Sequence, residues 1–200
     1  MIHAPLRMGI LLVVCGYLLS CGRSTPPPDL SASRTILAFG DSLTFGYGAK
    51  QSQSYPSVLA ELTGKRVINA GVNGETTSAG VRRISELLEE HRPDVVLLLE
   101  GGNDLLRRQS VASIKTNLLR MIELSQSHGA QVVLIAVPKP AIFGLSDHEV
   151  YAEVATQAQV FLLADVVSEV LSDADLRSDK IHPNAAGYRQ MAEALAVFFL

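Results

Sequence analysis

The sequence predicts an α/β domain in which helices cover both faces of a parallel sheet. From residue 35 onward, short apolar runs of strand length alternate with longer segments of helical periodicity, an order typical of such a sheet. Several of the apolar runs have no polar interruption, as expected for parallel strands that are buried on both sides. The composition, 48% apolar and 18% charged over 200 residues, suits one globular domain with a short appendage.

The expected strands and helices follow one another along the chain. The predicted strands cover 35–39, 66–70, 94–100 and 131–137, with a weaker one near 160–163. The predicted helices cover 55–62, 77–91, 111–127, 148–159 and the chain from about 184 to its end. In the second of these helices, Val81, Ile84 and Leu88 recur at helical spacing and form one apolar face. Sites in such sheets form beyond the carboxyl ends of the strands, so the residues that follow each strand are the first candidates.

The first 20 residues have the features of an export signal. Arg7 precedes an apolar run over 8–19, which is shorter than the roughly 20 residues of an ordinary transmembrane helix. The run ends in Leu18-Leu19-Ser20-Cys21, which resembles a bacterial lipobox, where the cysteine becomes the lipid-modified first residue. The alternatives are a plain signal peptide with an incidental Cys21 and a short anchor that is not cleaved.

This interpretation divides the chain into three parts. We expect a lipoprotein-type signal peptide over 1–20, a Pro/Ser-rich tether over 21–34 and the globular domain over 35–200. The protein is then expected on the periplasmic side of the cell envelope, held to the membrane by a lipid on Cys21, or secreted if Cys21 is not lipidated. Both cysteines, Cys15 and Cys21, precede the domain, which therefore has no cysteine for a disulfide, a metal site or a nucleophile.

The charge pattern gives no reason to expect a nucleic-acid partner. The formal net charge is −3, and the chain has no run of Lys or Arg residues. The sequence does not set the oligomeric state, and a monomer is the default expectation.

The first strand is followed by the motif Gly40-Asp41-Ser42-Leu43-Thr44. Ser42 could project from a tight turn into the crevice above the sheet, where its weakly acidic hydroxyl would need a neighbouring base to become a nucleophile. The alternative is structural, because Ser and Asp after a strand are common N-caps of a helix.

Two further motifs follow the second and third strands. Gly74 could offer a backbone N–H to an oxyanion, or it is a turn glycine with positive φ. Asn103, in Glu100-Gly101-Gly102-Asn103-Asp104, could donate an amide N–H into the same crevice, as side chains of oxyanion holes do. The alternative for this motif is a turn in which Asp104 caps a helix. We expect Glu100, at the end of its strand, to be a structural hydrogen-bonding residue.

The fourth motif is Asp179-Lys180-Ile181-His182, near the C-terminus. A free histidine titrates near neutral pH, which suits a general base. An aspartate three residues earlier could turn back and hold the imidazole, leaving its other nitrogen free for the serine. Taken alone, this motif before Pro183 is also compatible with a simple turn that leads into a helix.

In this order, the four motifs resemble the four sequence blocks of the SGNH, or GDSL-type, hydrolases, and they span residues 40–182. The strings GDSLTFGYGA and EGGND are most similar to the bacterial arylesterase, lysophospholipase and acyl-CoA thioesterase branch. The resemblance implies a flavodoxin-like three-layer α/β/α sandwich with strand order 2-1-3-4-5. It also implies hydrolysis without a metal or organic cofactor.

Carried over to this chain, the resemblance implies a role for each of five residues. Ser42 is the expected nucleophile, His182 the general base and Asp179 the residue that orients His182. The backbone N–H groups of Ser42 and Gly74 and the side-chain amide of Asn103 are the expected oxyanion hole.

The expected substrates are small acyl esters or thioesters, lipids included, and the alternative on the same site is carbohydrate O-deacetylation. Ile142, Phe143 and Leu145 could form a wall for an acyl chain or an aromatic leaving group, or they plug the core from an ordinary loop. Tyr47 is a second candidate for such a wall. A non-catalytic binding module is a third hypothesis, which a missing catalytic residue would favour.

Overall fold

A computed structural model describes residues 25–142 and 144–200. The predicted signal peptide, Cys15, Cys21 and Phe143 lie outside these residues. The described chain forms a five-stranded parallel sheet with the order β2-β1-β3-β4-β7, which confirms the predicted order 2-1-3-4-5. The strands are β1 (Thr35–Gly40), β2 (Arg66–Gly71), β3 (Val95–Leu99), β4 (Gln131–Ile135) and β7 (Phe161–Leu163).

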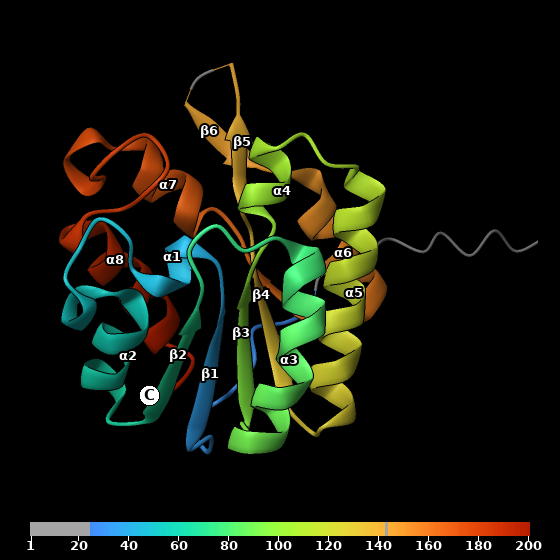
Figure 1. Cartoon of the computed structure of the whole chain (residues 1–200). Coiled ribbons are helices and arrows are strands. Elements are labelled where there is room, and N and C mark those ends of the chain that lie inside the picture. The colour runs from blue at the N-terminus through green and yellow to red at the C-terminus, as the bar shows by residue number, and fades with distance from the viewer. Residues whose placement is uncertain (1–24, 143) are drawn as a thin grey trace, which may run out of the picture.

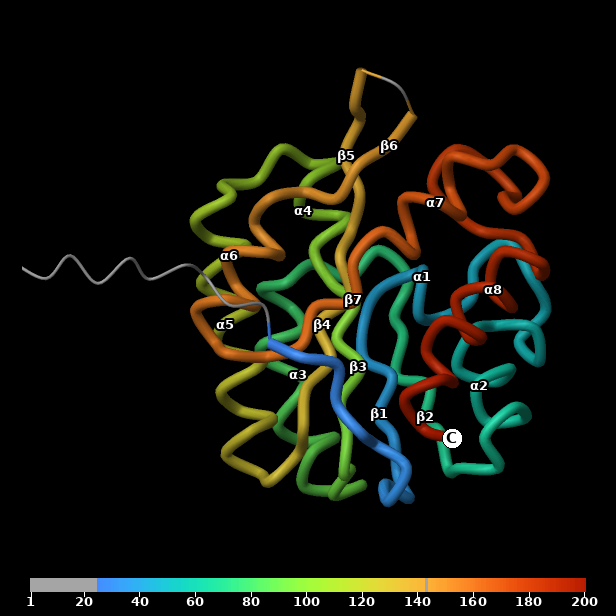
Figure 2. The backbone as a smooth tube through the Cα atoms, turned by 180° about the vertical axis from the view of Figure 1, so that it is seen from behind, coloured from blue at the N-terminus to red at the C-terminus, as the bar shows by residue number. Residues whose placement is uncertain are grey.

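Helices lie on both faces of the sheet, so the predicted three-layer α/β/α sandwich is also confirmed. Helices α2, α7 and α8 cover one face, and α3, α5 and α6 cover the other (Figures 1 and 2). The helices are α1 (Ser42–Phe45), α2 (Tyr55–Thr63), α3 (Thr77–His91), α4 (Gly102–Leu106), α5 (Val111–Ser127), α6 (Glu149–Ala158), α7 (Val166–Ser172) and α8 (Ala185–Ala196). Two short 3₁₀ helices, η1 (Gln51–Gln53) and η2 (Ala174–Leu176), lie beside the first of these layers.

Capping residues in the sequence set several of the helix boundaries. Helix α2 ends at Gly64, whose left-handed backbone, with φ of 67°, suits a residue without Cβ. Helix α8 begins after Asn184, whose side-chain oxygen accepts hydrogen bonds from the N–H groups of Ala186 and Gly187 at 2.9 and 3.1 Å. These signals explain why the long helices lie close to their predicted bounds.

Several short elements were not predicted. They are helices α1, α4 and α7, and a two-stranded antiparallel hairpin of β5 (Pro138–Pro140) and β6 (Leu145–Asp147) where the sequence suggested a loop. Elements of three to seven residues are too short to show a hydrophobic period, which explains their absence from the prediction. The hairpin follows β4 and projects from the end of the molecule that carries α1 and α4 (Figure 1).

The core is centred on β3, all five residues of which have no exposed surface. In the parallel register, Gly40 of β1 lies opposite Gly71 of β2 and Leu99 of β3, so the three strands end at the same level. A Cβ atom on Gly71 would lie 2.0 Å from the backbone nitrogen of Phe45. Glycine at this position therefore allows α1 to pack directly on the end of β2, which fixes the place of the Ser42 turn.

The described part of the predicted tether, from Thr25 on, runs along the domain. Leu30 is buried, and its N–H donates to the carbonyl oxygen of Phe198 at 2.8 Å. Within residues 25–142 and 144–200, no helix combines the length and the hydropathy that a bilayer span requires.

Candidate active site

Ser42 is the first residue of α1, and its side chain is not the cap of that helix. Asp41 is the N-cap, because its Oδ1 atom accepts the N–H of Leu43 at 3.0 Å. The hydroxyl of Ser42 is thereby left for another partner, the Nε2 atom of His182 at 3.0 Å. The helix cap that the motif allowed is therefore Asp41, and the neighbouring Ser42 hydroxyl is bound to His182 instead of to the helix.

His182 and Asp179 come from the loop that leads into α8. The Nδ1 atom of His182 lies 2.9 Å from Oδ2 of Asp179, while Oδ1 of Asp179 accepts the backbone N–H groups of Ile181 and His182 at 2.8 and 2.9 Å. Burial raises the pKa of Asp179, but the hydrogen bonds from His182 and Ile181 act the other way and lower it overall. An ionised carboxylate at Nδ1 favours the tautomer in which Nδ1 carries the proton, so Nε2 is free to accept one from Ser42.

The loops that carry Ser42 and His182 meet at Gly48 and Tyr47. A Cβ atom on Gly48 would lie 2.9 Å from the carbonyl oxygen of Pro183, and the φ of Gly48 is +90°. The ring of Tyr47 lies against the His182 imidazole, with centroids 4.5 Å apart, and the Tyr188 hydroxyl donates to the carbonyl oxygen of Tyr47 at 2.8 Å. These contacts hold the imidazole above the turn of the serine.

Three N–H groups around this turn come from the ends of β1, β2 and β3. Asn103 donates one amide hydrogen to Oδ2 of Asp41 at 3.2 Å, so its second amide hydrogen is available to another acceptor. The backbone N–H groups of Ser42 and Gly74 have no hydrogen-bond acceptor within the described residues. Gly74 has a positive φ of 75°, and the Arg107 side chain donates to its carbonyl oxygen at 3.1 Å. Gly74 is therefore a turn glycine with positive φ, and its N–H has no acceptor among the described residues.

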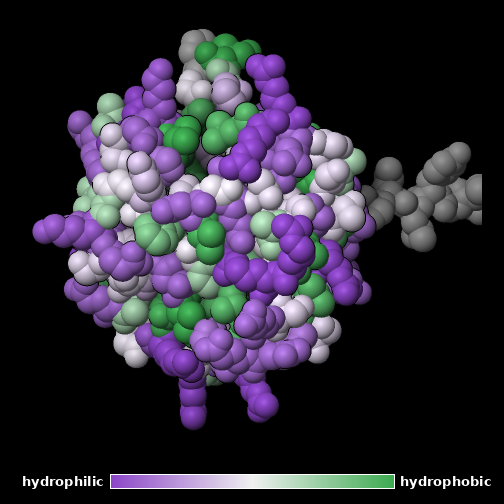
Figure 3. Space-filling view, in the orientation of Figure 1, coloured by the Kyte–Doolittle hydropathy of each residue, from purple (hydrophilic) through white to green (hydrophobic). Residues whose placement is uncertain are grey.

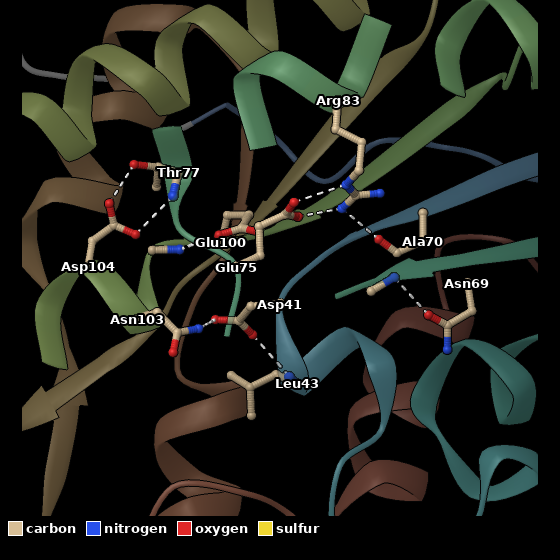
Figure 4. A network of polar contacts seen from close by, with 12 residues as sticks. Asp41, Leu43, Asn69, Ala70, Glu75, Thr77, Arg83, Glu100, Asn103 and Asp104 are labelled. Carbon is tan, nitrogen blue, oxygen red and sulfur yellow. Dashed lines mark hydrogen bonds and ion pairs between the residues drawn. The ribbon is translucent and has the colours of Figure 1, made fainter. Parts of the chain in front are cut away.

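A set of buried carboxyl groups lies behind this turn (Figure 4). Asp104 caps α3, as its two oxygens accept the N–H and the hydroxyl of Thr77 at 2.9 and 2.7 Å. Glu75 is bound through both oxygens by the Arg83 guanidinium, which also donates to the carbonyl oxygen of Ala70 at 2.9 Å. These bonds connect the β2–α3 loop to α4 and to the end of β2.

Asp41 is the member of this set that accepts a hydrogen bond from the Asn103 side chain. Its side chain is nearly inaccessible, and burial, partly offset by the hydrogen bonds from Leu43 and Asn103, raises its pKa to about 7. The carboxyl of Asp41 thus caps α1 and fixes Asn103 at the same time. Glu75 and Asp104 also lie near enough to act in the same direction on Asp41.

The hairpin carries the predicted substrate-wall residues. Ile142 lies at its tip and is 93% exposed, so the alternative that Ile142 plugs the core is wrong. Leu145 is half-buried and packs against the core. A depression near the tip is lined by Lys139, Pro140, Ala141, Ile142 and Ser146. Figure 3 shows a small area of hydrophobic surface at this projecting end, and other hydrophobic areas lie lower on the same face.

Three supporting residues of the site were not predicted from the sequence. Asp41 was expected only as a cap, and neither Arg107 nor Arg83 was expected to contribute to the site. The available signal for Asp41 was its position inside the motif. A carboxyl that is buried beside a turn needs several hydrogen-bond donors, so Asp41 needed a second donor besides the helix N–H. Arg107 gave no local signal, because its partner Gly74 lies 33 residues earlier in the sequence. Arg83 binds Glu75 only eight residues earlier, but this spacing is not the three or four residues at which side chains pair on a helix. Among the described residues, no group of three His, Cys, Asp or Glu side chains is arranged to hold a metal ion.

Comparison with known proteins gives consistent results. The model of the GDSL-like lipase/acylhydrolase family matches residues 38–190. An arylesterase of Vibrio mimicus is 34% identical over 175 residues, which are 82% of this chain and 88% of the relative. The thioesterase 1/protease 1/lysophospholipase L1 of Escherichia coli K12 is 31% identical over 173 residues, 83% of each chain.

A solved structure gives the same result at the level of the fold. The psychrotrophic esterase EstA of Pseudoalteromonas sp., in a crystal structure inhibited by monoethylphosphonate, superposes with a TM-score of 0.72. It is 28% identical, and the match covers 81% of this chain and 94% of EstA.

The raised pKa of Asp41 predicts a pH dependence of stability. The folded pKa of about 7 lies above the unfolded value of 3.8, so the native state binds more protons between these values. The contribution of Asp41 to the free energy of unfolding therefore decreases as the pH rises from about 4 to about 7. Asp41→Asn removes this titration, and the variant should lose less stability than the wild type over that range.

Urea denaturation at about pH 4.5 and about pH 7.5 measures the difference. Asp175→Asn, at an exposed aspartate of η2, is the control and should keep the wild-type dependence. Identical pH dependence in the wild type and Asp41→Asn would show that Asp41 does not titrate in this range.

Proposed function

The chain belongs to the GDSL-like lipase/acylhydrolase family and is a carboxylic ester hydrolase, and we propose that it cleaves acyl esters or thioesters by serine chemistry at Ser42. The observation that carries the proposal is the continuous series of hydrogen bonds from Ser42 Oγ through the His182 imidazole to Asp179. Its two links measure 3.0 and 2.9 Å. Both are within the range at which a base can take a proton from the hydroxyl.

The proposed reaction starts with attack of Ser42 Oγ on the substrate carbonyl carbon. His182 Nε2 takes the hydroxyl proton, and the Asp179 carboxylate stabilises the imidazolium that forms. The tetrahedral intermediate then collapses, the bond to the leaving alcohol or thiol breaks, and His182 returns the proton to it. Water then attacks the carbonyl carbon of the acyl-enzyme while His182 takes one of its protons. The second tetrahedral intermediate collapses, the bond to Ser42 Oγ breaks and His182 returns the proton to that oxygen, which releases the acid and regenerates Ser42.

The negative charge of each tetrahedral intermediate would be met by three donors. They are the N–H groups of Ser42 and Gly74 and the amide of Asn103, and the bond to Asp41 holds that amide in place before the substrate arrives. Arg107 would hold Gly74 in place in the same way, because its guanidinium donates a hydrogen bond to the carbonyl oxygen of Gly74. Donors that are fixed in advance cost no reorganisation at the moment of reaction, which makes them effective.

The choice of substrate is inferred from the hairpin and from the names of the relatives. The relatives are called arylesterase and thioesterase/lysophospholipase, names that suggest aromatic or long-chain acyl substrates for this chain too. We infer that Ile142, Phe143 and Leu145 form one wall of the acyl site, with Tyr47 on the side of His182. The exposure of Ile142 supports this, since an apolar side chain at a site entrance is covered only when a substrate binds.

We further propose that residues 1–20 are removed on export and that Cys21 carries a lipid. The domain would then act as a monomer at the membrane surface, on the periplasmic side. The lipobox-like sequence Leu18-Leu19-Ser20-Cys21 supports the proposal. A tether over 21–34 would keep the active site close to membrane lipids.

Ser42→Ala should abolish ester hydrolysis. We expect kcat on a p-nitrophenyl ester to fall by at least about 10⁴-fold, because the nucleophile is lost and only the oxyanion donors and substrate binding remain. Asn103→Ala should lower kcat by about 10²–10³-fold, the usual cost of one oxyanion donor. A phosphonate inhibitor should label the wild type at Ser42, as measured by mass spectrometry of the modified peptide.

The matched control is Ser127→Ala, at an exposed serine at the end of α5, which should leave both activity and labelling unchanged. Hydrolysis that persists in Ser42→Ala would move the nucleophile elsewhere. Labelling of a different residue would have the same consequence.

A series of p-nitrophenyl esters from C2 to C16 tests the substrate class. We expect activity on acyl chains of six carbons or more, and Ile142→Ser should reduce it on the long chains while leaving acetate hydrolysis unchanged. Val197→Ser, at another exposed apolar residue, is the control. A steep preference for acetate would instead favour carbohydrate O-deacetylation, and an unchanged profile in Ile142→Ser would remove the hairpin from the acyl site.

Lipidation is tested by substitution of the two cysteines in bacterial cells supplied with labelled fatty acid. Cys21→Ser should lose both the label and the association with the membrane fraction, because the proposed attachment site is removed. Cys15→Ser, six residues earlier in the same apolar segment, should keep both. Label that persists in Cys21→Ser would rule out the proposed anchor.

A further inference from the structure

Glu100 is the least exposed acidic residue of the described chain, and the proposed reaction gives it no role. Its side chain is fully buried just after β3. The Oε2 atom accepts the N–H of Gly101 at 3.0 Å, but Oε1 has no hydrogen-bond partner within the described residues. A buried carboxylate with one unpaired oxygen is costly, so this oxygen needs either a donor or a proton of its own.

The titratable and charged groups that face Glu100 come from every element packed around it. Tyr151 donates its hydroxyl to the backbone carbonyl oxygen of Glu100 at 2.7 Å, and Asp104 in α4 and Asp147 in β6 lie near that hydroxyl. Asp41 after β1 and Glu75 before α3 act on the Glu100 carboxyl itself, and Arg83 of α3 is bound to Glu75. The one cation in this set, Arg83, is already held by both oxygens of Glu75.

Figure 4 shows the side chains of Glu75 and Glu100 side by side, and Glu75 is one of the groups that raise the pKa of Glu100. Two neighbouring ionised carboxylates repel each other, whereas one shared proton turns the contact into a hydrogen bond. Glu75 already receives two hydrogen bonds from the Arg83 guanidinium, so both of its oxygens act as acceptors. The proton therefore belongs on Glu100, whose pKa is raised well above its ordinary value by burial and then by the nearby Asp41 and Glu75 carboxylates.

We propose that Glu100 is a neutral carboxylic acid in the native enzyme and that its O–H donates to the Glu75 carboxylate, which positions the oxyanion hole. Glu75 directly follows Gly74, and Glu100 is three residues before Asn103. The hydrogen bond thus joins the two loops that supply two of the three proposed oxyanion donors. Glu100 is a positioning residue, and this inference rests on the function proposed above.

Kinetics of four variants test the proposal. Glu100→Gln keeps a neutral donor of the same shape, so its kcat should stay within about threefold of the wild type. Glu100→Ala removes the donor, and kcat should fall at least about tenfold with little change in KM, because misplaced oxyanion donors affect the transition state more than substrate binding. Glu75→Gln should also lower kcat, since it weakens the bond to Arg83. The control, Glu89→Gln at an exposed glutamate of α3, should be unchanged.

Wild-type kcat in Glu100→Ala, or a loss in Glu100→Gln as large as in Glu100→Ala, would overturn the proposal. If Glu100→Ala does not fold, the kcat of Glu100→Gln still tests the proposal, since this variant keeps the shape of the side chain. Good tolerance of Glu75→Gln together with strong impairment of Glu100→Gln would place the proton on Glu75 and would also overturn it.

Infrared difference spectroscopy gives a readout that does not depend on hydrolysis. At neutral pH, the wild type should show the C=O stretching band of a buried protonated carboxyl. The band of Glu100 should disappear in Glu100→Gln and persist in Asp41→Asn and Glu89→Gln. A spectrum that is the same in Glu100→Gln and the wild type would refute the neutral acid.

The two proposals fail in different ways. Full hydrolytic activity in Ser42→Ala would refute the serine mechanism but would leave the infrared band of Glu100 in place. A missing band would refute the role of Glu100 but would leave the loss of activity in Ser42→Ala intact.

Discussion

The parallel register of β1 between β2 and β3 determines where everything else in the site lies. Gly40, Gly71 and Leu99 lie at the same level, so the chain leaves all three strands at one edge of the sheet. The segments with Ser42, Gly74 and Asn103 then start from neighbouring positions, although the sequence separates them by about thirty residues each. His182 alone comes from outside the sheet, and the close approach of its loop to Gly48 brings it to the same place.

This arrangement has an electrostatic cost, because it buries four carboxyl groups behind one turn. Asp41 and Asp104 accept hydrogen bonds from Asn103 and Thr77, which follow other strands, and Glu75 is bound by Arg83 of α3. These hydrogen bonds therefore also connect the segments around the turn. The repulsion among these groups is relieved by Arg83 and, in the proposal made here, by a proton on Glu100. Removal of a donor would leave a buried charge unpaired, which costs more than the hydrogen bond itself contributes. The same groups therefore stabilise the fold and restrict the motion of the oxyanion donors.

How much the sequence could predict depended on the range of the interactions. The long strands and helices were predictable, because runs such as 95–99 and the apolar face of 77–91 carry their signal locally. The strand order and the residues that meet at the sheet edge followed from the resemblance of four motifs. The hairpin was missed, since Pro138 and Pro140 make its first strand unlike an ordinary one. The contacts of Arg83 with Glu75 and of Arg107 with Gly74 were also missed, because neither follows a spacing that a sequence pattern reveals.

One side of the site is buried and the other is exposed to solvent. This asymmetry fits the proposed reaction, which needs both stabilisation of charge and access of water. The proposed oxyanion donors lie beside buried side chains, and exclusion of water strengthens hydrogen bonds to a developing charge. The Asp179 side chain, by contrast, is 46% exposed, and its carboxylate is bound to the His182 imidazole. In the proposed reaction, His182 activates the water that hydrolyses the acyl-enzyme, and this water can reach it from the exposed side. In this proposal, an exposed loop thus supplies the group that activates water, and the end of the sheet supplies the groups that stabilise charge.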